Sequence, residues 1–133
     1  MAGLLTHLLV SSGLALMVFY LFRNWIYSVA VAIGHLAPDL VDFGITGIKS
    51  GSLNPSRIIF DPWFYPLKLF GHNFFNWLII GLIIFAIVFF FYKLKKLSRK
   101  KLVIVTISIA LFLVGVLFHL GLDSLIQETN HWI

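Results

Sequence analysis

The stretch GHLAPDLVD gathers one histidine and two aspartates, His35, Asp39 and Asp42, at the end of an apolar run. The whole chain has only five acidic residues, and charged side chains near a bilayer are costly and usually functional. A second pair, His119 and Asp123, repeats the four-residue spacing of His35 and Asp39. That spacing places each pair on one face of a helix, where an imidazole and a carboxylate can share a metal ion. Both pairs therefore indicate metal chemistry.

The composition is that of a membrane protein. Of the 133 residues, 60% are hydrophobic and 11% are charged, and the mean hydropathy is +1.00. These values exclude an ordinary soluble globule and a disordered tail, and the length allows a single domain over residues 1–133. The chain has no cysteine, which excludes disulfides and thiolate-bound zinc. A metal ion would therefore be bound by imidazole and carboxylate, which suit zinc, manganese or iron.

The positive charge is concentrated in one short segment. The net charge is +5, and six of the ten basic residues lie within residues 93–101: Lys93, Lys95, Lys96, Arg99, Lys100 and Lys101. Basic residues between two apolar runs are a topology signal of membrane proteins. We therefore expect a basic hairpin at the membrane surface and no nucleic-acid partner.

The hydropathy pattern predicts an all-α fold with four transmembrane helices. The expected spans are residues 4–22, 25–38, 74–92 and 102–122. No basic residue precedes the first span, so it lacks the charged start of a secretory signal peptide and is expected to be retained. Gly115 and Gly121 in the fourth span allow close helix packing. Whether that packing is within one chain or between chains is open at this stage, as is the oligomeric state.

The second span is short. From Trp25 to Pro38 a helix covers about 20 Å at 1.5 Å per residue, whereas a hydrocarbon core is roughly 30 Å thick. Pro38 cannot donate a hydrogen bond to the carbonyl of Gly34. We therefore expect a kink or a helix end near Asp39, which would lie close to the membrane surface.

Residues 43–67 are expected to form a loop at the interface. The segment is rich in Gly, Ser and Pro, and it contains two apolar and aromatic pieces, residues 58–60 and 63–65. These pieces are too short to span a bilayer. They fit a lid that lies against the headgroups.

The topology brings the polar residues to one side. Short loops rich in Lys and Arg stay in the cytoplasm, so the 93–101 hairpin is expected inside, together with Arg23. Both termini and the 43–67 loop would then lie outside a cell or inner membrane. All five histidines and all five acids fall on this outer side, and each of the four helices contributes at its outer end. This convergence predicts a site at the outer face.

The order of these residues resembles a known family. The motifs are THLL at His7, GHLAPDLVD, GHN at His72 and HLGLDSL from His119 to Leu125. They resemble the membrane-bound metal-dependent hydrolase family (YdjM-like, long a domain of unknown function), which is distantly similar to zinc-dependent phospholipase C. The family pattern has a second acid where this chain has Val41, a histidine where it has Asp42, and often a serine where it has Asn73.

The resemblance implies a set of metal ligands and a reaction. The implied ligands are His7, Asp39, His72, His119 and Asp123, with His35 as a further ligand or its support. They would hold one or two divalent ions, zinc above all, which would polarise a phosphoryl or acyl oxygen and activate water. Asp42, or Asp39 where it is not a ligand, would act as general base. The expected activity is hydrolysis of a lipid or lipid-linked phosphoester at the outer membrane face.

Each residue also has a plain structural interpretation. Asp39 would pair with Lys68 or Arg57, and His72 would help begin a helix with Asn73. His7 would lie at the interface or form a hydrogen bond, and His119 would hydrogen-bond to Asp123 between turns. Asp42, Asp61, Glu128 and His131 would be solvated. Two alternatives to the hydrolase follow: a protein that binds or transports metal without hydrolysis, and a small structural membrane protein. Transport is disfavoured because the cytoplasmic halves of the spans have essentially no ionisable groups. The clustering of all these residues favours the metal site.

Overall fold

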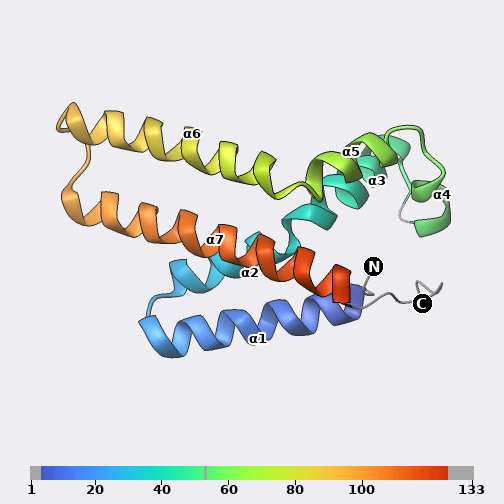
Figure 1. Cartoon of the computed structure of the whole chain (residues 1–133), viewed down its shortest axis with the longest axis horizontal. Helices are drawn as coiled ribbons and strands as arrows, with labels where there is room; N and C mark the ends of the chain where they lie inside the picture. The colour runs from blue at the N-terminus through green and yellow to red at the C-terminus, as the bar shows by residue number, and fades with distance from the viewer. Residues whose placement is uncertain (1–3, 53, 126–133) are drawn as a thin grey trace.

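The structure is a computed structural model that describes residues 4–52 and 54–125, so Glu128 and His131 lie outside the described residues. Within these ranges every regular element is a helix (Figure 1). The elements are α1 (Leu4–Phe22), α2 (Trp25–Asp39), a π-helical turn η1 (Leu40–Gly44), α3 (Ile45–Ser50), α4 (Pro55–Ile59), α5 (Phe64–Gly71), α6 (Phe74–Lys93) and α7 (Arg99–Leu125). The predicted fold class, an all-α protein with four spanning helices, is confirmed.

Four helical segments are long and apolar enough to cross a membrane. They are Leu5–Phe22, the continuous helical segment Trp25–Ser50, Phe74–Lys93 and Arg99–Leu125, with mean hydropathies between 1.3 and 2.7. Most of their large apolar side chains are exposed. A helix that is apolar on nearly all sides belongs in a bilayer or a large core, and a chain of this length has no large core. The four helices therefore fit an integral membrane protein.

The α-helical part of the second spanning segment ends at Asp39, as expected from Pro38, but the segment as a whole continues beyond this residue. It passes through the π-helical turn η1 and continues as α3 to Ser50. Pro38 cannot donate to the carbonyl one turn back, and a wider turn lets the helix resume after such an interruption. The segment is consequently 26 residues long, about 39 Å at 1.5 Å per residue. The helical segment is therefore longer than the span expected over residues 25–38.

Residues 43–67 form short helices instead of the expected loop. After α3 the chain turns at Gly51, which has a left-handed φ of 62°. The side chain of Asn54 accepts a hydrogen bond from the Ser56 amide and begins α4 with Pro55 in the first turn. The rings of Phe43 and Phe64 pack edge to face at 4.9 Å between centroids. Proper helix starts and aromatic packing therefore give this Gly- and Pro-rich segment regular structure.

Two tight connections lie at one end of the molecule, which we call the hairpin end (Figure 1). They are residues 23–24 between α1 and α2, and residues 94–98 between α6 and α7. Arg23 and Lys95 have left-handed φ angles of 51° and 57°. The connection after α6 is shorter than the expected 93–101 hairpin because lysine and arginine are good helix formers, so the helices extend into the basic segment.

The core consists of two small clusters along α2 and α7. One contains Leu14, Val18, Tyr27 and Val31, and the other contains Ala37, Trp77 and Val116. Helix α2 packs between α1 and α7, and α6 packs on the other side of α7 (Figure 1). The indole of Trp77 donates a 2.6 Å hydrogen bond to the carbonyl of Gly71, which fixes the start of α6 to the end of α5.

Glycines allow the closest backbone approach in the fold, between α2 and α7. A side chain at Gly34 would overlap the backbone of Phe112, and one at Gly115 would overlap the carbonyl of Val31. The small-residue packing expected for Gly115 is therefore found within one chain, whereas a side chain at Gly121 would meet nothing within 4 Å among residues 4–52 and 54–125. His35 follows Gly34 directly and His119 lies one turn after Gly115, so this crossing brings the two histidines together.

Candidate metal centre

The polar residues singled out from the sequence gather at the end of the bundle opposite the hairpin end. They come from α1, α2 with η1, the link between α5 and α6, and α7. We call them the His/Asp cluster: His7, His35, Asp39, Asp42, His72, His119 and Asp123. The side chains of His7, His119 and Asp42 are wholly buried, and that of Asp39 is 10% exposed. Residues up to 116 positions apart in the chain are in contact here.

His72 and His119 form one side of the cluster. Their Nε2 atoms are 3.4 Å apart, and both face the Oδ2 atom of Asp123, at 3.3 Å from His72 and 3.6 Å from His119. The Oδ1 atom of Asp39 lies 3.6 Å from His119 Nε2 and 4.0 Å from His72 Nε2. Two imidazole nitrogens and two carboxylate oxygens therefore converge.

His7 forms the other side of the cluster. Its Nε2 atom lies 3.2 Å from Asp123 Oδ1 and 4.0 Å from Asp39 Oδ2, and its ring stacks on His119 with 4.2 Å between centroids. The opposite nitrogen, Nδ1, is 3.3 Å from Nε2 of His35. His35 therefore lies behind His7 and supports its ring orientation through a hydrogen bond.

The orientation of His72 is set from outside the cluster. Its Nδ1 atom is 3.2 Å from the carbonyl of Lys68 and 3.6 Å from Asp42 Oδ2. A carbonyl only accepts, so Nδ1 carries the proton and donates to Lys68, and Nε2 directs its lone pair into the cluster. The Lys68 carbonyl is a partner that the sequence analysis missed, because a backbone group leaves no residue-type signal.

The charge state of His72 reflects opposing influences. Burial lowers the pKa of its imidazole, but the hydrogen bond to Asp123 and the negative charges of Asp42, Asp123 and Asp39 outweigh burial. The net result is a pKa above the usual 6.5. A cation at Nε2, either a proton or a metal ion, is therefore favoured.

Among the described residues, Asp39 has no hydrogen-bond donor on either oxygen, although both oxygens are buried. Its ion-pair distances within the described residues are to the histidines, at 3.6–4.0 Å, and the expected pairing with Lys68 or Arg57 is not among them. A buried carboxylate without a donor is costly. A metal ion coordinated by Asp39 and the facing imidazoles would remove that cost.

Asp42 lies behind His72. In contrast to the expected solvated position, it is fully buried, one oxygen accepts a 2.7 Å hydrogen bond from the Phe43 amide, and the other faces His72 Nδ1. Its carboxylate therefore lies beside Nδ1 of His72. It does not face the Nε2 atoms of His72 and His119 that point into the cluster. Asn73, at the position of the family's serine, caps α6 by accepting a hydrogen bond from the Phe75 amide.

The cluster can hold a metal ion by its spacing. One set, Asp39, His72 and His119, offers ligand atoms that all lie within 4.8 Å of one another, and so does a second set, His7, His35 and His119. Carboxylate and imidazole together suit divalent first-row metals. The donor set therefore fits such an ion.

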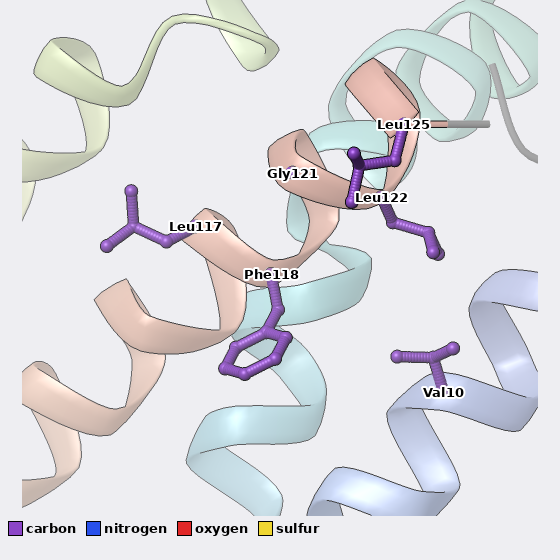
Figure 2. A pocket seen from close by; sticks show the side chains of 6 residues that line it. All are labelled: Val10, Leu117, Phe118, Gly121, Leu122 and Leu125. Atoms are coloured by element: carbon purple, nitrogen blue, oxygen red, sulfur yellow. The ribbon is translucent and has the colours of Figure 1, made fainter. Parts of the chain in front are cut away.

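An apolar groove lies between α1 and α7 (Figure 2). It encloses about 550 Å³ between α1 and α7, and it is lined by Val10, Leu117, Phe118, Gly121, Leu122 and Leu125. Phe118 directly precedes His119 in the chain, and Leu122 directly precedes Asp123. Val10 lies about one helical turn after His7. The groove therefore lies against the backbone segments that hold three members of the cluster.

Comparison with known proteins identifies no family for this chain: no family model, curated protein or solved structure matches it significantly. The resemblance to the YdjM-like hydrolases therefore rests on the motifs alone.

Proposed function

We propose that the protein is a metal-dependent hydrolase that acts at the outer membrane face on a lipid or lipid-linked phosphoester. The observation that carries this proposal is the environment of Asp39. Its buried oxygens have no donor in the part of the chain that the structure describes, and the Nε2 atoms of three histidines lie within 4.0 Å of them. The lone pairs of the carboxylate and of the imidazoles repel one another in a buried site, and a cation bound between them would remove that repulsion.

The spacing supports zinc as that cation. Zinc binds histidine and carboxylate at about 2.0–2.2 Å, so ligand atoms at the corners of a tetrahedron lie roughly 3.3–3.6 Å apart. The distances between His72 Nε2, His119 Nε2 and Asp123 Oδ2 are 3.3–3.6 Å. A zinc ion held there would supply Lewis acidity toward a phosphoryl oxygen and make water a better nucleophile.

The residues of the chain divide into three roles under this proposal. His7, His72, His119, Asp39 and Asp123 hold the ion, because their atoms face one another. Asp42 and His35 orient His72 and His7 from behind. Asp39 and Asp123 are the carboxylates that face the centre, and either would accept a hydrogen bond from a water molecule held there.

The surroundings support a lipid substrate. The cluster lies at the end of spanning helices, and the groove lined by Phe118, Gly121 and Leu122 offers an apolar wall beside it. Its volume of about 550 Å³ is within the roughly 300–1,000 Å³ of small-molecule sites. The exposed apolar side chains of Ile48 and Phe60 on the α3–α5 segment fit a position against the headgroups.

The proposal is tested by metal content and turnover of the full chain in lipid nanodiscs. Wild-type protein should retain zinc or manganese and hydrolyse a member of a panel of lipid phosphoesters. Asp39→Asn should lose both metal and activity. The control is Asp61→Asn, which should keep both, because the wild-type Asp61 carboxylate accepts a hydrogen bond from the Trp63 amide and is not part of the cluster. Retained metal without turnover would favour the non-catalytic metal-binding alternative. Wild-type protein that binds no metal after reconstitution would favour the structural one.

The lipid substrate has its own matched pair of variants. A side chain at Gly121 or at Gly13 would meet no described residue within 4 Å, but of these two glycines only Gly121 lines the groove. Gly121→Leu should raise KM severalfold for a long-chain phosphoester and leave a short-chain analogue unchanged, while Gly13→Leu should alter neither. Equal KM values for both chain lengths in wild-type and Gly121→Leu protein would contradict the role of the groove.

A further inference from the structure

Asp39 and Asp123 each divide their two oxygens between the two sides of the cluster. Oδ1 of Asp39 faces His119 and His72, at 3.6 and 4.0 Å, whereas its Oδ2 faces His7 at 4.0 Å. Asp123 repeats the division, with Oδ2 toward His72 and His119 at 3.3 and 3.6 Å and Oδ1 toward His7 at 3.2 Å. Two carboxylates that divide their oxygens in the same way are arranged as bridges between two cations.

We propose that the cluster holds two divalent metal ions that share Asp39 and Asp123. His72 and His119 complete one site, which we call site A, and His7 completes the other, site B. Two-metal sites in hydrolases keep their ions roughly 3.5–4 Å apart, a separation that one carboxylate can bridge. This inference rests on the metal site of the proposed function and adds the number and arrangement of the ions.

Site A has a full set of protein ligands. Two imidazole nitrogens, from His72 and His119, and one oxygen each from Asp39 and Asp123 make four donors, the number that zinc takes in closed sites. Nδ1 of His72 donates to the Lys68 carbonyl, the hydrogen bond through the other ring nitrogen that ligating histidines usually make. Site A is therefore the more completely coordinated site.

Site B has three protein ligands. They are His7 Nε2 and the second oxygens of Asp39 and Asp123, and three protein ligands with an open position are typical of catalytic zinc. Nδ1 of His7 hydrogen-bonds to His35 at 3.3 Å, so this ligand is also oriented through its other nitrogen. Site B is therefore the position that accepts water or substrate.

The charge of the loaded cluster indicates its substrate. Two divalent ions carry more positive charge than Asp39, Asp123 and the nearby Asp42 neutralise, and the histidines are neutral when they bind metal. Bound ions of this kind dominate the local field. The loaded cluster would attract an anionic group, which favours a phosphoester over a neutral carboxylic ester.

The number of ions is measured on the full chain in nanodiscs by elemental analysis after loading with zinc. Wild-type protein and Asp61→Asn should hold two ions per chain. His7→Ala and His119→Ala should each hold one, because each removes ligands from one site only. Asp123→Asn should hold fewer than one, because its carboxylate contributes to both sites. Circular dichroism and size-exclusion chromatography identify the folded fraction that is counted.

Loading with Mn²⁺ tests the arrangement without any variant. Two ions bridged by carboxylates should give an exchange-coupled electron paramagnetic resonance spectrum, and His7→Ala should convert it to the spectrum of isolated Mn²⁺. One ion in wild-type protein, or the loss of all metal in both His7→Ala and His119→Ala, would overturn the two-ion site. Two coupled ions without hydrolysis would support the two-ion site but contradict the proposed hydrolase function. Hydrolysis by protein that holds one ion would support the hydrolase function but contradict the two-ion site.

Discussion

His72 is the one histidine of the cluster that lies outside the four spanning segments, between α5 and α6. Its Nδ1 donates a hydrogen bond to the Lys68 carbonyl, and its Nε2 faces Asp123. Burial opposes a charge on this ring, but the surrounding carboxylates raise its pKa above 6.5. The metal-free protein therefore binds a proton at His72 more readily than a free imidazole does, whereas the metal-loaded protein requires a neutral ring.

The two forms should consequently respond to pH in opposite directions. In the metal-free protein the contribution of His72 is fully present below pH 6.5 and is lost as the pH rises through its raised folded pKa. In the loaded protein the ion competes with the proton, so stability rises over the same range. Each proton contributes a slope of about 1.4 kcal/mol per pH unit. Thermal unfolding between pH 6 and 8, with and without zinc, measures both slopes.

A His72→Gln variant is the control for this prediction. Glutamine retains a donor for the Lys68 carbonyl but does not titrate, so the slope of the metal-free protein should decrease. Parallel slopes in metal-free and loaded wild-type protein would contradict the competition between proton and ion at His72.

At the scale of single residues, the sequence predicted which side chains lie close together, but it did not predict how those side chains are oriented toward one another. Topology and the spacing of His119 and Asp123 were enough to bring the histidines and aspartates to one end of the bundle. The positions of Asp42 behind His72 and of His35 behind His7 were not predictable, because they depend on helix rotation and side-chain packing. Those are set by contacts distant in sequence, above all between α2 and α7.

At the scale of elements, the crossing of α2 and α7 positions the cluster. Gly34 and Gly115 let the two backbones touch, and small residues at such crossings are a common means of helix association in membranes. His35 and His119 adjoin this contact on the two helices. A wider separation of the helices would therefore move both histidines and disturb the cluster.

Gly115→Ala should destabilise the protein, because its methyl group would overlap the Val31 carbonyl. Overpacking of this kind costs about 1–3 kcal/mol, and the variant should also bind metal more weakly. Gly121→Ala, on the same helix with nothing within 4 Å, should leave stability unchanged or raise it by up to about 1 kcal/mol. Thermal unfolding in detergent and zinc titration compare the pair. Equal stability of the two variants would contradict the close approach.

Hydropathy identified the four spanning helices, because long apolar runs have few other uses in a chain of this size. It did not predict that the second helix continues through η1 to Ser50 or that residues 43–67 contain α3, α4 and part of α5. Pro38 indicated a break, and α2 does end one residue later at Asp39, but the π-helical turn η1 continues the helical segment beyond it. Ring packing such as that of Phe43 on Phe64 involves residues far apart in the chain, which local patterns do not report.

At the scale of the whole molecule, positive charge and the His/Asp cluster lie at opposite ends. The described basic residues at the hairpin end include Arg23, Lys93 and Arg99, and residues 93–101 alone hold six. The other end of the described chain has three: Lys49, Arg57 and Lys68. The positive-inside bias therefore favours a cytoplasmic hairpin end and an outer cluster.

The absence of cysteine from the chain makes this orientation directly measurable. Ser98→Cys lies in the hairpin between α6 and α7, and Ser52→Cys lies beyond α3 at the other end. In right-side-out vesicles a membrane-impermeant maleimide should label Ser52→Cys at once and Ser98→Cys only after permeabilisation. The wild-type chain, which has no thiol, should not be labelled. The reverse order would place the cluster on the cytoplasmic side and move the proposed hydrolysis to the inner leaflet, although the cluster and its metal chemistry would be unchanged.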